Sequence, residues 1–478
     1  MRILCLPLDS RPCNTQWVRE LVAWAGSEAV LPQEEEMDRF FTPAPHAASR
    51  AFLERELPGC GAAVISLDHW CYGGLLASRA EDVSPEEALN RVEELKEILA
   101  RHPQTPVFMS SVITRSSIST LSQDDLDVYR AMTDYSFYTG RYAQEGREED
   151  ARLAEAARKR IPEAVLGKVM RVRARNLRVN LAAVDLAAEG RVRALSLLQE
   201  DTQVYGLPRK DQAEIARRLA KTGAKNVFLR NGADEGGTLS AAEALSMGRE
   251  SLPAELCFLG DSGFTALYED RPFAQNVENA CLEIGIRPQA GSENVLFVCC
   301  PPDGKQKEAG QEWEDPAIAA YGAAIEKKVR EGRRVYVLDV IGANGGSLAL
   351  LRCLSCPEKL WGYSAWNTAS NSLGTLLAQM VSDSIRGSRN EAFYQARLLD
   401  DLLYQTVIRF QLADQLKAWG EDPLRIRDRK RAEEALSRLY REALPARWPL
   451  KTTPHFRATL PWNRSFEVKI SEVQTGKE

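Results

Sequence analysis

The feature that most constrains this chain is a repeated unit, in which a short apolar run ends in polar residues and leads into an amphipathic helix. Eight such runs stand out, at residues 3–9, 62–68, 107–114, 195–201, 227–235, 256–261, 295–300 and 335–339. They are continuously apolar rather than alternating, which is typical of strands covered on both faces. Strands of this kind that alternate with helices predict an α/β fold with a parallel sheet.

The number of units favours a closed barrel. Eight strand–helix units can close into a (β/α)8-like barrel, which is the fold we expect. Possible further strands at 29–32 and 360–366 leave an open doubly wound sheet, or two of them, as alternatives. Ser84-Pro85-Glu86-Glu87 is a capping box with proline at the first helical position, and it predicts a helix start at residue 85.

The domain organisation follows from a change of pattern along the chain. We expect an α/β catalytic domain over residues 1–384, with a charged helical insertion at 124–180. After it the strand–helix repeat gives way to long helices. Residues 385–478 therefore read as a helical C-terminal region that ends in a Pro/Trp-rich tail.

Composition excludes several classes of partner. The net charge of −5 argues against nucleic acid, because a phosphate-binding face needs a basic excess. No run is long enough to cross a membrane and no signal peptide is visible, so we expect a cytoplasmic protein. The 10 cysteines read as reduced thiols, and Cys353-x-x-Cys356 with only 4 histidines in the chain gives no zinc motif. We expect no cofactor and no bound metal, and the oligomeric state stays open.

Polar residues that follow the apolar runs are the candidate ligand-binding groups, because ligands of parallel α/β folds bind beyond the carboxyl ends of the strands. Asp9 and Arg11 after the first run can accept from and donate to neighbouring hydroxyls. Asp68 and Tyr72 follow the second run beside two glycines, and Arg115 follows the third. A salt-bridged helix cap and an aromatic turn packed under the rim are the structural alternatives for these residues.

Two acidic pairs are the candidate catalytic groups. Glu200–Asp201 follows the fourth run and Asp234–Glu235, flanked by glycines, follows the fifth. Adjacent carboxylates at a buried strand end are unfavourable unless one is protonated, hydrogen-bonded or catalytic. An N-cap aspartate beside a solvated glutamate is the structural alternative.

A later segment is suited to a sugar ring, which has an apolar face and a polar rim. Asn344 precedes two glycines, and Trp366 and Asn367 lie in a stretch rich in aromatic and amide side chains. We expect these three residues to bind substrate.

The order of several motifs resembles a known family. Leu-Asp-Ser-Arg-Pro at 8–12, Gly-Ala-Asp-Glu at 232–235, Trp-Asn-Thr-Ala at 366–369 and Pro-Trp-Asn-Arg at 461–464 resemble a bacterial family catalogued as a domain of unknown function. The acidic pairs also resemble those of barrel N-acetylhexosaminidases that use substrate-assisted catalysis. That likeness implies that Glu200 polarises the acetamido group of the substrate and that Asp201 is the general acid.

Three functions fit these residues. The first is a glycoside hydrolase with a small-molecule carbohydrate as partner, and N-acetylhexosaminides are the candidate substrates. Two facing acidic pairs would also allow a conventional two-carboxylate mechanism. The second is a Mg²⁺- or Mn²⁺-dependent hydrolase or lyase whose strand-end aspartates hold the metal, namely Asp9, Asp68, Asp201 and Asp234. The third is a non-catalytic protein that binds a sugar or another small molecule.

Overall fold

The computed structural model describes residues 1–119, 125–310 and 316–475. The chain divides into two compact units. The N-terminal unit consists of Met1–Ala244 with Tyr268–Asp270, and the C-terminal unit consists of Leu245–Leu267 with Arg271–Glu478.

The N-terminal unit is built on a six-stranded parallel sheet in the order β2-β1-β3-β4-β5-β6. Its strands are β1 (Arg2–Leu6), β2 (Glu28–Val30), β3 (Ala62–Ser66), β4 (Val107–Ile113), β5 (Ala194–Gln199) and β6 (Val227–Asn231). Every residue of β3, β4 and β5 is buried. That burial on both faces is why these segments are continuously apolar in the sequence.

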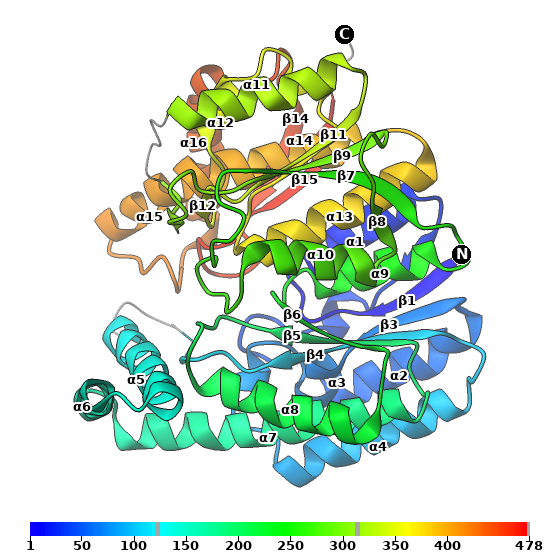
Figure 1. Ribbon diagram of the computed structural model, residues 1–478, viewed down its shortest axis with the longest axis vertical. Coiled ribbons are helices and arrows are strands. Elements are labelled where there is room, and N and C mark those ends of the chain that lie inside the picture. Colours follow the sequence, from blue (N-terminus) through cyan, green and yellow to red (C-terminus); the bar gives the residue numbers. More distant parts are fainter. Residues whose placement is uncertain (120–124, 311–315, 476–478) are drawn as a thin grey trace. The chain divides into compact units, whose positions relative to one another are not determined.

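Helices cover both faces of this sheet (Figure 1). One face carries α1 (Gln16–Trp24) and α9 (Gly236–Ser246). The other carries α2 (His46–Glu56), α3 (Leu67–Tyr72), α4 (Pro85–Ala100), α7 (Glu163–Ala188) and α8 (Leu207–Thr222). The predicted start of α4 is confirmed, because the Ser84 hydroxyl accepts a hydrogen bond from the backbone N–H of Glu87 at 3.1 Å.

The side of the sheet on which successive strands are added changes between β1 and β3. From β1 the chain moves to β2 on one side, and it then returns to place β3, β4, β5 and β6 in succession on the other side. In open α/β sheets such a switch point opens a crevice at the carboxyl ends of the two strands concerned. The loops after β1 and β3 are therefore the first place to look for a site.

The segment predicted as an insertion is helical, and only part of it stands apart from the sheet. It contains α5 (Leu126–Glu145), α6 (Glu148–Lys159) and residues 163–180 of α7, while residue 124 lies outside the described residues. The second half of α7 packs on the sheet through Val179 and Ala183. So α7 is the crossover helix between β4 and β5, and α5 and α6 are the additional elements.

The C-terminal unit is built on a second parallel sheet in the order β13-β11-β9-β7-β8. Its strands are β7 (Leu252–Leu259), β8 (Ile286–Pro288), β9 (Asn294–Cys299), β11 (Arg334–Asp339) and β13 (Gly362–Ser364). Counted from its own first strand, this sheet repeats the order of the first five strands of the N-terminal sheet. Helices α10 (Phe273–Glu283) and α13 (Ala369–Arg386) lie on one face and α11 (Pro316–Arg330) on the other (Figure 1).

The predicted helical C-terminal region is confirmed, and it belongs to the same compact unit as the second sheet. It contains α14 (Glu391–Arg397), the π-helix Leu398–Ile408, α15 (Arg409–Ala418) and α16 (Arg429–Arg447). The tail forms an antiparallel hairpin of β14 (His455–Thr459) and β15 (Lys469–Gln474). The remaining short elements of this unit are β10 (Lys307–Glu308), β12 (Gly342–Ala343) and α12 (Leu348–Arg352).

The parallel strand–helix repeat is confirmed, but the closed eight-stranded barrel is not. The eight predicted runs fall into two sheets, with the division between β6 and β7, near residue 245. A barrel and an open sheet need the same buried strands and the same amphipathic helices, so the local pattern is identical in both. The sequence left two open sheets as an alternative, and that is the arrangement of the described strands.

Candidate functional site

Charged side chains gather at the carboxyl edge of the N-terminal sheet. Arg11 follows β1, Arg79 follows α3, and Arg115 follows β4. The acidic residues of this edge follow β1, β3, β5 and β6, and they are Asp9, Asp68, Glu200, Asp201 and Asp234. Parallel strands end at one edge, so five separate segments deliver charge to one region.

Arg11 is clamped between two carboxylates. Its Nη2 lies 2.7 Å from Asp9 Oδ2 and 2.5 Å from Asp234 Oδ1, and its Nη1 donates to Asp234 Oδ2 at 3.0 Å. Burial by itself raises the pKa of Asp9, but the charge of Arg11 and hydrogen bonds from Arg11 and Asn14 outweigh burial, so the pKa is lowered. Asp9 is therefore an ionised, fully buried carboxylate.

The Arg11–Asp234 pair shows that the carboxyl edge is curved. Three strands separate β1 from β6 in the sheet, yet the loops that follow these two strands touch. Helix α9 also approaches α1, since a Cβ on Gly237 would lie 3.5 Å from Val18. A small apolar cluster lies in the same region, and its members are Leu8, Leu75, Val112, Leu198 and Ala233.

The first acidic pair is held by the other two arginines. Arg79 forms an ion pair with Glu200, and Arg115 forms one with Asp201. Arg115 also lies 3.8 Å from Glu200, so that carboxylate faces two guanidinium groups. The Ser119 hydroxyl accepts a hydrogen bond from Arg79 Nη1 at 2.8 Å.

The two groups of ion pairs act on one another. Burial lowers the pKa of Arg79 to about 9, and the positive charges of Arg115 and Arg11 lower it as well, while Asp201 and Asp234 raise it. These charges must therefore lie within short Coulombic range of Arg79. At pH 7 the guanidinium still carries its proton, so the edge is a single site with paired charges of both signs.

Two further carboxyl groups of this edge keep a proton near neutral pH. Burial raises the pKa of Asp68 to about 7, although the backbone N–H of Val112 donates to it at 2.8 Å. Asp38 lies in the loop after β2, and burial together with the negative charge of Asp9 raises its pKa well above the usual range. The site thus combines ionised carboxylates with protonated ones, which is what acid–base chemistry requires.

Several buried polar atoms of this site have no hydrogen-bond partner among the described residues. They are Asn14 Oδ1, Arg79 Nε, Arg115 Nε and Ser116 Oγ. Buried polar atoms are almost always hydrogen-bonded in native proteins, so each such group needs an explanation. A bound polar ligand that reaches Arg79, Arg115 and Ser116 satisfies them together.

Tyr72 and Glu235, which the sequence suggested as site residues, make contacts that hold the fold together. The Tyr72 ring lies under the Arg175 guanidinium at 4.3 Å, and Arg175 donates to the carbonyl of Ser78 at 2.6 Å. Glu235 forms an ion pair with Arg230 at 2.8 Å, and both side chains are at most 4% exposed. The second acidic pair is therefore divided, with Asp234 directed to Arg11 and Glu235 to β6.

The predicted residues 344, 366 and 367 belong to the C-terminal unit. Asn344 and Asn367 have positive φ angles of 60° and 54°, and the Asn344 N–H donates to the Asn367 carbonyl at 2.7 Å. Asn344 Nδ2 also donates to Glu308 at 2.9 Å. Trp366 is 6% exposed and its Nε1 donates to Thr375 at 3.1 Å, so its ring is part of the core.

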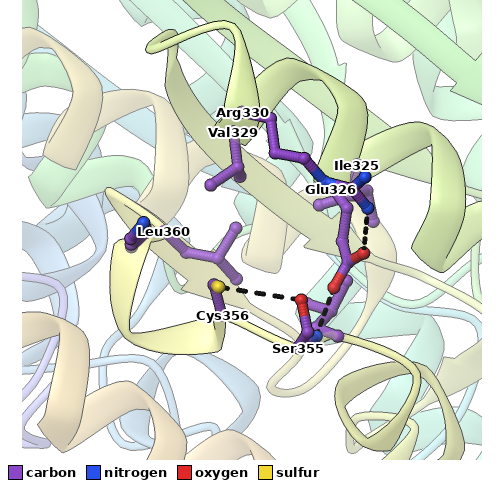
Figure 2. A pocket seen from close by; sticks show the side chains of 9 residues that line it. Ile325, Glu326, Val329, Arg330, Ser355, Cys356 and Leu360 are labelled. Atoms are coloured by element: carbon purple, nitrogen blue, oxygen red, sulfur yellow. Dashed lines mark hydrogen bonds and ion pairs between the residues drawn. The ribbon is translucent and has the colours of Figure 1, made fainter.

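A pocket in the C-terminal unit lies near the amino ends of strands β11 and β13 of its sheet (Figure 2). Ile325, Val329 and Arg330 come from the end of α11, just before β11, and Leu360 comes just before β13. Hydrogen bonds from Ser355 and the ion pair with Arg330 lower the pKa of Glu326 to about 2. Glu326 thus fastens the Ser355 loop to α11, and the carboxyl edge of this sheet is not involved.

Sequence reasoning missed Arg79 and Asp38 as site residues. Arg79 follows helix α3 and Asp38 lies in a loop eight positions beyond the end of β2, so neither directly follows a strand. For Arg79, its position just after the Asp68–Tyr72 motif was a usable signal. For Asp38 the local sequence offers none.

Within residues 1–119, 125–310 and 316–475, no group of three or more His, Cys, Asp or Glu side chains could hold a metal ion. The aspartates that were candidates for metal ligands include Asp9 and Asp234, which share Arg11, and Asp201, which holds Arg115. Among the described helices, none is both long and apolar enough to cross a bilayer.

Comparison with known proteins gives one match. Residues 3–471 match the family described as protein of unknown function (DUF4127). Neither the curated proteins nor the solved structures contain a significant match to the chain. The matched region covers almost the entire sequence and includes both units, so the chain belongs to the DUF4127 family.

Proposed function

We propose that the protein is a glycoside hydrolase whose site is the carboxyl edge of the N-terminal sheet. The observation that supports this most is the set of buried arginine and serine atoms without partners beside the acidic pair. Guanidinium donors beside carboxylate acceptors are suited to a ligand rich in hydroxyl groups, because each hydroxyl both donates and accepts. A carbohydrate is such a ligand.

The proposed roles of the carboxyl groups follow from their surroundings. Glu200 and Asp201 each hold an arginine, which requires the ionised form, so they stabilise the positive charge that develops on the sugar ring. The proton donor must instead hold its proton at neutral pH. Asp68, whose pKa burial raises to about 7, fits that role better than Asp201, the general acid expected from the sequence.

An N-acetylhexosaminide remains the proposed substrate class within the glycosides. In substrate-assisted catalysis the acetamido group of the sugar is the nucleophile, and the enzyme supplies a carboxylate that orients it. Glu200 is suited to that role, because it is 8% exposed and two guanidinium groups hold it in place. The resemblance of the acidic pair to those enzymes is the reason to test this class first.

The test is a screen of the full chain, in EDTA, against nitrophenyl glycosides that include the N-acetylhexosaminides. We expect turnover that Asp201→Asn and Asp68→Asn each reduce by about 10²–10⁴-fold, because the first removes a charge that stabilises the transition state and the second removes the proton donor. Asp185→Asn is the matched control, since its carboxylate is 40% exposed on α7 and pairs with Arg218. The control should retain wild-type turnover.

Three other outcomes have distinct meanings. Absence of turnover on every glycoside contradicts the proposal. Activity on another substrate class that appears only with added Mg²⁺ or Mn²⁺ would establish the metal-dependent alternative. Tight sugar binding without turnover would establish a binding protein.

We also propose that the protein acts in the cytoplasm. All ten cysteines are free thiols, including the buried Cys299–Cys300 pair, which is typical of a reducing compartment. Fractionation of the native cells tests this, and recovery outside the cytoplasm would contradict it.

A further inference from the structure

A short segment of the chain belongs to the N-terminal unit although both of its flanks belong to the C-terminal unit. This segment is Tyr268–Asp270, which we call the strap. An antiparallel bridge between Thr265 and Pro272 closes its base, and the N–H of Phe273 donates to the Phe264 carbonyl at 2.9 Å. The strap is therefore the tip of a tied loop and not an extended connection.

The strap fixes the loop that carries the first acidic pair. The backbone N–H of Thr202, the residue directly after the pair, donates to the Tyr268 carbonyl at 2.9 Å. Gln199 directly precedes the pair. Gln212 Nε2 on α8 donates to Asp270 at 2.6 Å and to Gln199 at 2.8 Å. Gln199 in turn donates to the Glu200 carbonyl at 2.8 Å. Asp270 is thus connected through two glutamines to the backbone of the acidic pair.

Tyr268 has an unusual backbone conformation and lies near Arg115, one of the arginines of the site. Its φ of 69° is in the left-handed region, which a tyrosine adopts only where the surroundings enforce it. Burial lowers the pKa of Arg115, but Asp201, Tyr129 and Tyr268 raise it, and the net shift is upward. The Tyr268 phenol is therefore close enough to Arg115 to act on its charge.

We propose that the strap is part of the N-terminal site, with Asp270 as a positioning residue for the acidic pair and Tyr268 as a substrate contact. The substrate contact rests on the proposed function, whereas the positioning role does not. The aromatic ring adds an apolar face beside the charged side chains of the edge, and one face of a sugar ring is apolar. Trp366, which the sequence suggested for that purpose, is occupied in the core of the other unit.

The test compares three variants of the full chain. Tyr268→Gly removes the ring and keeps a residue that favours φ of 69°. Asp270→Asn removes the charge that Arg209 and Gln212 hold, with little change of shape. Glu472→Gly is the backbone-matched control, because Glu472 has a φ of 56° in the terminal hairpin of the C-terminal unit.

Two readouts separate the positioning role from the proposed function. With the nitrophenyl N-acetylhexosaminides, Tyr268→Gly should raise KM roughly tenfold, and Asp270→Asn should lower kcat with little change in KM. In hydrogen–deuterium exchange, Asp270→Asn should speed exchange of residues 200–207 about tenfold, while Glu472→Gly leaves it unchanged.

Kinetic constants within twofold of wild type for both variants would overturn the strap proposal and leave the hydrolase intact. If wild type turns over no glycoside, the proposed function fails and the exchange measurement alone decides about the strap. Unchanged exchange in Asp270→Asn would then overturn the positioning role.

Discussion

The ion pairs of Arg11 allow a quantitative prediction about the N-terminal unit. Replacing Arg11 with methionine removes the guanidinium that two carboxylates share, Asp9 at 0% and Asp234 at 10% side-chain exposure. Breaking a buried ion pair by removing one member costs about 3–5 kcal/mol, since the remaining charge stays buried. We expect Arg11→Met to lower the free energy of unfolding by about that amount, a large share of the 5–15 kcal/mol typical of a domain.

A triple variant isolates the cause of the loss. Arg11→Met combined with Asp9→Asn and Asp234→Asn removes all three charges, so no uncompensated ion is left, and at least half of the lost stability should return. Arg171→Met is the surface control, because its guanidinium is 66% exposed and pairs with Glu81. Its effect should lie within about 0.5 kcal/mol of zero.

The assay is urea unfolding, which gives the free energy of unfolding. Hydrogen–deuterium exchange of peptides from the N-terminal unit then shows whether the loss of stability lies in that unit. The pH dependence supplies a second check. In wild type the lowered pKa of Asp9 means that its contribution is present above its unfolded pKa of 3.8 and is lost as the pH falls through the folded value. In Arg11→Met the isolated Asp9 takes up a proton on folding, so the variant regains stability as the pH falls and the gap to wild type narrows. A loss below about 1 kcal/mol, or a triple variant no more stable than the single one, would refute the reasoning.

Two further predictions concern stability. Burial raises the pKa of Asp68 from 3.8 to about 7, so its ionisation disfavours the folded state increasingly as the pH rises from 4 to 7. The free energy of unfolding of Asp68→Asn should therefore rise by up to about 4 kcal/mol relative to that of wild type between pH 4 and pH 7. A difference in urea unfolding that does not depend on pH would contradict this prediction. Gly140 on α5 leaves no space for a side chain, because a Cβ there would lie 2.2 Å from the backbone N of Gly206. Gly140→Ala should displace α5 from the loop after β5 and cost about 1–3 kcal/mol in thermal unfolding, and an unchanged Tm would refute that contact.

Much of the local structure could be predicted from the sequence. Each of the eight apolar runs overlaps a strand, and the suspected strands near residues 29 and 363 correspond to β2 and β13. These predictions succeed because burial on both faces leaves a compositional trace in each strand. Strand β8 has only three residues, of which two are exposed, so no such trace exists for it.

The assignment of strands to sheets could not be predicted in the same way. It depends on which hydrogen bonds β6 and β7 make, and both strands are equally apolar whether they pair with each other or with different neighbours. The site shows the same limit. The sequence identified Asp9, Arg11, Arg115 and the first acidic pair from their positions after strands, but ion-pair partners are a property of the folded chain. For that reason the ion pair of Arg79 with Glu200, the burial of Asp38 beside Asp9 and the contacts of the strap were found only in the structure.

The strap also has a consequence for the order in which the protein is assembled during synthesis. The N-terminal unit is not complete when the ribosome reaches residue 244, because its last three residues are made some 25 positions later. By then β7 (Leu252–Leu259) has emerged, yet its partners β8 and β9 begin only at Ile286 and Asn294. A nascent chain that has just closed its first unit therefore carries a strand of the second with no partner to pair with, and unpaired strand edges promote aggregation. Slow emergence of residues 270–299 from the ribosome lengthens that interval, and a nascent-chain chaperone has the most to protect while this stretch emerges.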